Sequence, residues 1–408
     1  MAWCAQITVG DAAMNVSHRL SGLTGGGSDG WDVFYKARAM KAAGTPVVEL
    51  TIGEHDIRTS PAILDEMHRA ARAGHTGYAA VPGIPDLRAA VAARVQARTG
   101  VLTGPQNVVI TPGGQSALFA AHMAALDPGE RALYLDPYYA TYPGTIRGAG
   151  GVAVSVPTQS EADFQPTRAA LDAALGDAPA RSLLINTPNN PTGVIYGAKT
   201  LGIIADFTCA NDMWLISDEV YDTQVWDGAH LSPRALPGMA ERTLVVGSMS
   251  KSHAMTGSRV GWLVGPEDII AHLINLSTHT TYGVPGFLQD AALWALRQGD
   301  AFEAEIAAPF RRRRDQTLAQ INAQDIVRAL PSGGAMYLML DVRDTGLSGE
   351  AFADALLDAH HIATMPGESF GASAAGHIRL ALTVDDAALR SAVETLLQFA
   401  ADLASKAA

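Results

Sequence analysis

The chain is poor in cysteine, in basic residues and in long apolar runs. Cys4 and Cys209 are its only cysteines, and their separation fits no metal-ligand spacing, so we expect no metal site. Two thiols in a chain of 408 residues suit a reducing cytoplasm. No apolar run reaches the roughly 18 residues that span a bilayer, and the N-terminus lacks the basic and apolar regions of a signal peptide. These absences predict a cytoplasmic protein without a membrane-spanning segment.

Acidic residues outnumber basic ones, with 41 Asp and Glu against 29 Lys and Arg and a net charge of −12. Such a chain repels nucleic acid and anionic lipid, so we expect neither as a partner. Hydrophobic residues make up 48% of the 408, which is enough to build the cores of two domains. Residues before about Ser17 look weakly structured, and the sequence does not decide whether Met1 or Met14 is the natural start.

Short apolar runs rich in β-branched residues alternate with helical patterns, such as 115–126 and 200–211, through the middle of the chain. They are apolar on both parities, as strands covered on both faces are. Alternating strands and helices predict an α/β fold with a mostly parallel, seven-stranded sheet. The last two strands lack a full crossover helix between them, which favours an antiparallel edge strand there. The predicted strands are residues 107–111, 132–136, 152–156, 182–186, 213–218, 243–247 and 260–265.

The pattern changes after Pro285. A long helical region from Phe287 to Ile321 leads into a glycine-containing strand, a helix, the strand HIRLAL and a final helix. This order predicts a separate, smaller α+β domain. The helix and strand of residues 31–51 have no partners nearby in sequence, so we expect them to join that domain. The predicted units are a large domain at 56–300 and a small domain formed by 15–55 and 301–408.

The most informative segment is GSMSKSHAMTGSRVGW, at residues 247–262. Lys251 follows a buried strand in a loop rich in serine and glycine, and alone it would indicate a surface lysine in a turn. Its neighbours change this interpretation, because Ser248 and Ser250 offer hydroxyl donors and Arg259 offers a fork of N–H donors suited to phosphate. A lysine that forms a Schiff base with an aldehyde, held beside an anion site, is what pyridoxal-phosphate chemistry requires.

This pattern, S-x-S-K-x-x-x-x-x-G-x-R-x-G, resembles the signature of the class I/II aminotransferases, which are aspartate-aminotransferase-like members of pyridoxal-phosphate fold type I. The resemblance extends from about Ala37 to the C-terminus, with further motifs in the expected order. It implies pyridoxal 5′-phosphate as the cofactor and Lys251 as its Schiff-base lysine. It also implies that Ser248, Ser250 and Arg259 hold the phosphate.

The segments SDEVYDTQ and NTPNNPTG each follow an apolar run. The resemblance implies that Asp218 keeps the cofactor's pyridine nitrogen protonated, as a buried carboxylate does. It further implies that Tyr221 and Asn190 hydrogen-bond the phenolic oxygen of the cofactor. The alternatives are a helix-capping Asp218, a packed Tyr221 and a plain turn at Asn190. Cis peptide bonds before Pro191 and Pro137 are also implied, although cis is the minority state of such bonds.

Three more segments concern the cofactor. In TPGGQSALF a strand ends, glycines follow and a helix begins, and the free N–H groups of a helix start bind anions; the resemblance places Gly113, Gly114 and Gln115 at the phosphate. In DPYYATYPG it places Tyr139 against the cofactor ring, with core packing as the alternative. In GYAAVPGIPDL it implies that Tyr78 reaches the site of a neighbouring subunit, so we expect a homodimer.

HIRLAL contains Arg379 in an apolar strand, where a charge is costly unless it is paired. The resemblance implies that Arg379 grips the α-carboxylate of the substrate, beside Gly53 and Asn190; a structural salt bridge is the alternative. Some family members present a second cation to a distal carboxylate, but the matching segment THTTYGVPG offers only His279 and Tyr282. We therefore expect a neutral or aromatic amino acid as the donor.

The implied reaction is a ping-pong transfer of an amino group between an L-amino acid and a 2-oxo acid, with the Lys251 amine as general base and acid. A pyridoxal-phosphate carbon–sulfur lyase on the same scaffold is the alternative. A non-enzymatic pyridoxal-phosphate-sensing regulator is a remote one, because only about thirty residues precede the aminotransferase-like region. Three features have plain interpretations: a solvated helix face at 311–314, a helix end at His360 and His361, and a flexible loop at 25–30.

Overall fold

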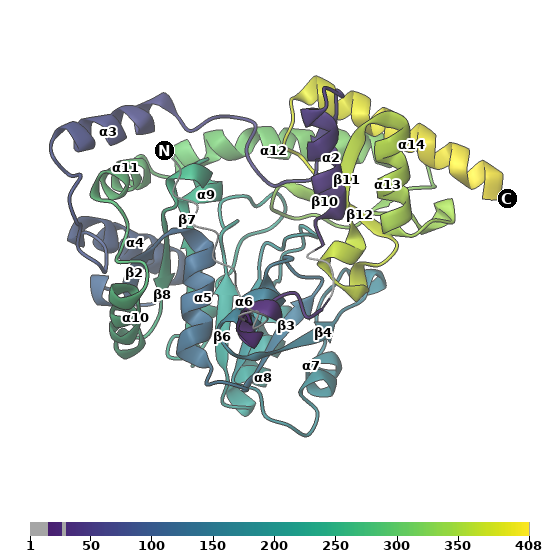
Figure 1. The fold of residues 1–408 in the computed structure, drawn as a ribbon. Helices are drawn as coiled ribbons and strands as arrows, with labels where there is room; N and C mark the ends of the chain where they lie inside the picture. The colour runs from purple at the N-terminus through teal and green to yellow at the C-terminus, as the bar shows by residue number, and fades with distance from the viewer. Residues whose placement is uncertain (1–14, 27–29, 408) are drawn as a thin grey trace, which may run out of the picture.

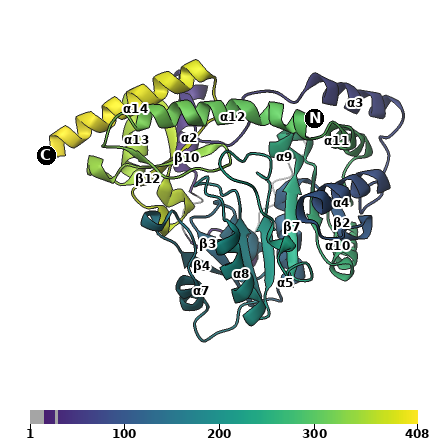
Figure 2. The same cartoon turned by 180° about the vertical axis from the view of Figure 1, so that it is seen from behind.

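The computed structural model describes residues 15–26 and 30–407. The predictions for the N-terminus, Cys4, Met14 and the middle of the loop at 25–30 lie outside the described residues. Two sheets, each with helices packed against it, occupy different parts of the molecule in Figures 1 and 2. No helix in the described ranges is both long and apolar enough to cross a membrane.

The larger sheet contains every strand predicted for the middle of the chain, in the order β2-β8-β7-β6-β5-β3-β4. Its strands are β2 (Val108–Thr111), β3 (Arg131–Asp136), β4 (Val152–Pro157), β5 (Ser182–Asn186), β6 (Trp214–Asp218), β7 (Thr243–Ser248) and β8 (Gly261–Val264). The prediction that β8 runs antiparallel is confirmed, but its predicted edge position is wrong, because β8 lies between β7 and β2. The short connection from β7 to β8 predicts that β8 runs antiparallel to β7 and pairs with it. It does not predict which strand pairs with the other edge of β8.

Helices cover both faces of this sheet (Figure 1). They are α3 (Pro61–Arg72), α4 (Pro85–Thr99), α5 (Gly113–Ala125), α6 (Tyr142–Gly148), α7 (Arg168–Leu175), α8 (Ala198–Ala210), α9 (Met249–Ser252), α10 (Glu267–His279) and α11 (Gly286–Arg297). Alternate residues of a strand face opposite sides. Leu184 and Ile216 pack with α5 and α10, whereas Leu183 and Leu215 pack with α7 and α8. Burial on both faces explains why these strands are apolar on both parities.

The smaller sheet has the order β1-β11-β12-β10-β9. Its strands are β1 (Val48–Leu50), β9 (Arg328–Ala329), β10 (Tyr337–Asp341), β11 (Ile362–Pro366) and β12 (His377–Ala381). Because β1 pairs with β11 in parallel, the N-terminal segment joins the C-terminal elements, as predicted. The core beside this sheet also draws on helices α2 (Asp32–Ala42), α12 (Asp300–Ile321), α13 (Gly349–His360) and α14 (Asp386–Ala407), whereas the short α1 (His18–Ser21) buries no residue. The domain limits drawn from the sequence stay a prediction.

The helical region predicted from Phe287 to Ile321 is divided into two helices. Helix α11 ends at Arg297 and α12 begins at Asp300, and Gly299 between them has a φ of 77°. Glycine enters this left-handed region without the steric penalty of a Cβ atom, so the break falls there.

The prediction of a solvated helix face at 311–314 is wrong for Arg313. This side chain is buried and pairs with Asp56 and Asp386, while Arg312 on the same helix stays exposed. Asp56 lies 257 residues away in sequence, so no local pattern indicated this pairing.

Candidate active site

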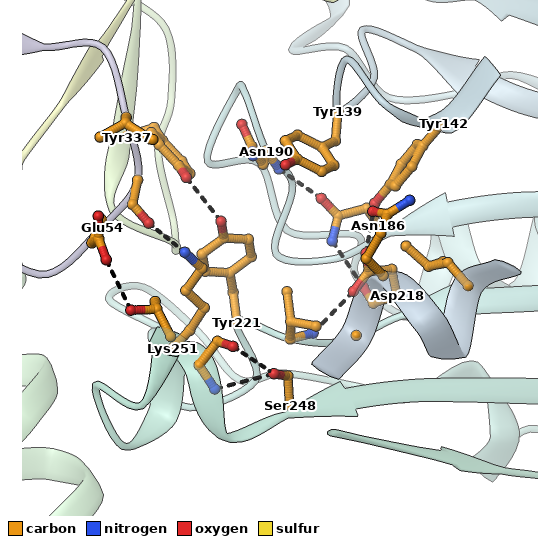
Figure 3. A pocket seen from close by; sticks show the side chains of 18 of the residues that line it. Glu54, Tyr139, Tyr142, Asn186, Asn190, Asp218, Tyr221, Ser248, Lys251 and Tyr337 are labelled. Atoms are coloured by element: carbon orange, nitrogen blue, oxygen red, sulfur yellow. Dashed lines mark hydrogen bonds between the residues drawn. The ribbon is translucent and has the colours of Figure 1, made fainter. Parts of the chain in front are cut away.

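A cavity of about 320 Å³ lies where the carboxyl ends of β5, β6 and β7 meet residues of the smaller sheet. Figure 3 shows its side chains converging from both sheets. Most of the residues predicted for the site line it, namely Gly53, Gly114, Gln115, Tyr139, Asn190, Asp218, Tyr221, Ser248, Ser250, Lys251, Arg259 and Arg379. Gly113 and Tyr78 are the predicted site residues that do not line it.

Lys251 lies in α9, one turn after the end of β7 (Figure 3). The Ser248 hydroxyl caps this short helix by accepting from the Ser250 N–H at 3.1 Å, which fixes the direction of the turn. The Lys251 amine donates to the Gly53 carbonyl on the opposite wall. Burial lowers the pKa of this amine to about 8, and the nearby Glu54 carboxylate opposes that shift. The site therefore makes the neutral form of the lysine more accessible near neutral pH than it is for a lysine in water.

Asp218 ends β6 and is buried without a cationic partner in the described part of the chain. Its carboxylate accepts from the Tyr142 hydroxyl at 2.8 Å and from the Val220 N–H at 3.2 Å. Burial raises the pKa of Asp218 to about 6, and these two hydrogen bonds limit the shift. A carboxylate held this way has the charge and the position to pair with a cationic ring nitrogen in the cavity.

Arg379 is a buried cation that has no carboxylate partner among the described residues. One terminal nitrogen donates to Asn190 Oδ1 at 2.8 Å and the other donates to the Thr51 carbonyl. The ring centroids of Tyr337 and Phe370 lie 4.5 and 4.4 Å from the guanidinium carbon of Arg379. Its Nε atom is buried and has no hydrogen-bond partner among the described residues. The predicted alternative of a structural salt bridge finds no carboxylate here, so the group can receive one from a ligand.

The start of α5 forms a hollow that contains donors and a cation. Gly113 has a φ of 79°, and a Cβ atom there would lie 2.3 Å from an Arg259 guanidinium nitrogen. Arg259 donates to the Thr256 carbonyl at 2.8 Å and forms no ion pair within the described ranges. Gly114 and Gln115 line the cavity at the first turn of the helix, where N–H groups are free. This arrangement suits a phosphate group.

Two tyrosines that the sequence interpretation missed contact predicted site residues. Tyr142 donates to Asp218, and the Tyr337 hydroxyl lies 2.9 Å from that of Tyr221 (Figure 3). Tyr142 belongs to the DPYYATYPG segment, from which only Tyr139 was chosen. Tyr337 stands in a strand that looked like ordinary core. Other cavity residues outside the prediction are Trp31, Ile52, Glu54, Leu118, Asn186, Val220 and Thr256.

Tyr78 lies apart from this cavity. It is 93% exposed and packs edge to face against Tyr282, with the ring centroids 5.1 Å apart. A single chain therefore does not bring Tyr78 to its own site. The peptide bonds before Pro137 and Pro191 are cis, as predicted, and a third cis bond precedes Pro188.

Together the fold and the cavity define a class of α/β protein in which a lysine of lowered pKa shares one cavity with a helix start and with a buried arginine that has no carboxylate partner among the described residues. Comparison with known proteins agrees with this class. Residues 45–396 match the sequence model of the family described as aminotransferase class I and II. The chain therefore belongs to the class I and II aminotransferase family, and it is an aminotransferase.

The relatives named as enzymes are transaminases. The arginine–pyruvate transaminase of Pseudomonas aeruginosa is 40% identical over 385 residues, which cover 94% of this chain and 98% of the relative. The aspartate/prephenate aminotransferase of Thermus thermophilus is 36% identical over 88% of this chain and 92% of its own. The structure of the Thermus thermophilus aspartate aminotransferase with maleate has a TM-score of 0.87 at 34% identity, covering 95% of this chain and all of that one. The lyase alternative gains no support from these comparisons.

Proposed function

We propose that this aminotransferase uses pyridoxal 5′-phosphate, attached to Lys251, to exchange an amino group between an L-amino acid and a 2-oxo acid in two half-reactions. The observation that carries the proposal is a set of ionisable groups in one cavity that form no ion pair with one another or with other described residues. Lys251 has a lowered pKa, Asp218 lacks a cation and Arg379 lacks a carboxylate among the described residues. A cofactor and an amino acid together supply each missing partner.

The residues present fit this cofactor at each of its polar groups. The hollow at Gly113, Gly114 and Arg259 fits the phosphate, with the Ser248 and Ser250 hydroxyls and the Gln115 N–H nearby. Asp218 is placed to hold the ring nitrogen protonated, and Tyr221 and Asn190 to donate to the phenolic oxygen. Asn190 Oδ1 already accepts from Arg379, which leaves its amide N–H groups as donors. Tyr139 lines the cavity as the candidate for stacking on the ring.

When bound, the cofactor supplies an electron sink for the carbon that carries the amino group. The chain's own residues do the rest. Arg379 holds the α-carboxylate by a two-pronged hydrogen bond, next to the backbone of Gly53. The Lys251 amine would remove the α-proton of the amino acid as a general base and return it as a general acid.

The cavity favours donors that have only one carboxylate. Lys251, Arg259 and Arg379 are the cations that line it in the described part of the chain, and each already has a role. Glu54 also lines the cavity, and its carboxylate would repel a second carboxylate on the substrate. We therefore propose a neutral or aromatic donor, and a basic donor such as the arginine named for one relative also fits. Because other relatives are named for aspartate, the support for this choice is the cavity and not the names.

The same proposal includes a homodimer in which the exposed Tyr78 of one protomer reaches the phosphate hollow of its partner. It also includes the large domain at 56–300, the small domain formed by 15–55 and 301–408, and a cytoplasmic location consistent with two cysteines.

A spectral screen of the purified protein against single amino acids tests the proposal. We expect a visible absorption band that is absent in Lys251→Ala and that is lost when a donor is added, with release of the matching 2-oxo acid. Among phenylalanine, alanine, arginine and aspartate, we expect aspartate to have the lowest kcat/KM. A wild-type protein without a visible band would overturn the cofactor assignment, and aspartate as the best donor would overturn the substrate preference.

A further inference from the structure

Tyr337 contributes a hydroxyl group that the proposed function does not use. It lies on β10, and its oxygen is 2.9 Å from the Tyr221 hydroxyl, with the two rings edge to face at 5.9 Å and 78° (Figure 3). Both side chains are buried. Each hydroxyl carries one proton, so the bond between them uses one of the two protons and leaves the other free for a second partner.

The proposed role of Tyr221 decides which proton is left free. No described residue other than Tyr221 accepts from the Tyr337 hydroxyl. Gly53 also closes one side of this hydroxyl, where a Cβ atom would come within 1.6 Å of the oxygen. Both tyrosines line the cavity, so their position alone does not choose the donor. In the proposed function Tyr221 gives its one proton to the phenolic oxygen, and the 2.9 Å bond between the two hydroxyls then requires Tyr337 as its donor.

We propose that Tyr337 is a positioning residue, whose hydroxyl donates to the Tyr221 oxygen and thereby directs the Tyr221 proton to the phenolic oxygen of the bound cofactor. This inference rests on the proposed function. Hydrogen bonds in a chain polarise one another, so donation from Tyr337 makes Tyr221 a stronger donor. Tyr221 then stabilises negative charge on the phenolic oxygen and lowers the pKa of the Lys251–cofactor chromophore.

The ring of Tyr337 has a separate role, which a test must keep apart from that of the hydroxyl. Its centroid lies 4.5 Å from the Arg379 guanidinium carbon, and Phe370 lies 4.4 Å from the same carbon. Tyr337→Phe removes the hydroxyl and keeps the ring. Phe370→Leu is the matched control, because it removes an aromatic contact of Arg379 and leaves the tyrosine pair intact.

The measurement is a pH titration of the visible absorption band of the holoenzyme. We expect Tyr337→Phe to raise the pKa of the band by about 0.5 to 1 unit, which corresponds to the loss of one neutral hydrogen bond. Tyr221→Phe should raise it further. In the Tyr221→Phe background, Tyr337→Phe should add no shift, because its influence passes through the Tyr221 oxygen. Phe370→Leu should raise the KM for the amino acid and leave the pKa of the band unchanged.

Two results overturn the inference alone: an unshifted band in Tyr337→Phe, or an equal shift with and without Tyr221. Either would show that Tyr337 serves only as a ring beneath Arg379. A wild-type protein that shows no visible band overturns the proposed function and this inference with it. Thermal unfolding of each variant, compared with the wild type, confirms that the spectra are those of folded protein.

Discussion

Arg379 and Arg313 are both buried arginines, but they lie in regions with opposite electrostatics. On α12, Arg313 donates two hydrogen bonds to Asp56, of 2.8 and 2.7 Å, and a third to Asp386, of 2.8 Å. In the cavity, Arg379 meets an amide oxygen, a backbone carbonyl and two aromatic rings. In the first region the fold neutralises the arginine, and in the second the arginine has no carboxylate partner among the described residues, which fits the proposed binding of a ligand carboxylate.

The carboxylates of the two regions differ in the same way. Hydrogen bonds from Arg312 and Arg313 lower the pKa of Asp386 to about 2, whereas burial without a cation raises the pKa of Asp218 to about 6. Buried ions without partners destabilise a fold, so their presence indicates function. The comparison thus separates structural from functional charges, and it predicts different consequences for removing each.

The largest effect is expected for Arg379→Leu. Losing the partner of the substrate carboxylate should lower kcat/KM for the amino acid by about 100- to 1000-fold, equivalent to roughly 3 to 4 kcal/mol. The unfolding midpoint should stay within about 3 °C of the wild type, because removal of an unpaired buried cation offsets the lost hydrogen bonds. A loss of activity below tenfold, or a large loss of stability, would show that Arg379 has a structural role like that of Arg313, and it would contradict the contrast drawn between the two.

The reverse outcome is expected for Arg313→Leu. It leaves Asp56 without its arginine and Asp386 with Arg312 alone, and we expect the free energy of unfolding to fall by about 1 to 3 kcal/mol. This loss of stability is small for a broken buried ion pair, because both carboxylates remain in contact with solvent. The side chain of Asp56 is 23% exposed and that of Asp386 is 33% exposed. Urea unfolding measures the loss. The control is Arg313→Lys, which keeps the charge and should retain part of the stability, and kcat/KM of folded Arg313→Leu should stay within about fivefold.

A smaller effect on stability is expected for Asp218→Asn in the cofactor-free protein. Because the folded pKa of Asp218 is about 6, above its usual 3.8, the ionised carboxylate destabilises the fold above pH 6. We expect the variant to be more stable by about 1 to 2 kcal/mol at pH 8. This difference should shrink as the pH falls from about 6 through 3.8, and it should vanish well below 3.8, where the wild-type carboxyl is protonated in both states.

Asp136 provides the control for that experiment. It is also a buried carboxylate at a strand end, and burial raises its pKa to about 6 as well, but it does not line the cavity. Asp136→Asn should therefore change stability in the same direction and keep the affinity for pyridoxal 5′-phosphate, which Asp218→Asn should lose. Equal cofactor affinity in both variants would contradict the role of Asp218.

The sequence predicted the functional region better than the structural one. Asp218, Asn190 and Lys251 each follow a buried strand, and the carboxyl ends of parallel strands meet at one edge of a sheet, so local motifs sufficed. Arg313 and its partners are 257 and 73 residues apart, and no local pattern joins them. Tyr337 was missed because an aromatic residue in an apolar strand usually indicates core, and Tyr142 was missed because its segment holds three tyrosines, of which only Tyr139 was chosen. The position of β8 was missed because pairing with β2 is a long-range choice.

The smallest effect concerns Lys251, whose neutral amine is the proposed nucleophile. With a pKa of about 8, roughly one amine in ten is neutral at pH 7. The rate at which cofactor-free protein develops the visible band on addition of pyridoxal 5′-phosphate should rise up to pH 8 and then level off. Glu54 favours the charged amine, so Glu54→Gln should lower the pKa of Lys251 and move this plateau down by about half a pH unit. Thr256→Val, which removes the hydroxyl that donates to Glu54 at 3.0 Å and keeps the carboxylate, should leave the plateau near its wild-type position. A plateau that moves to higher pH or stays fixed in Glu54→Gln would contradict the influence of Glu54. It would show that burial alone determines the pKa of Lys251 and that the charges in the cavity do not affect one another.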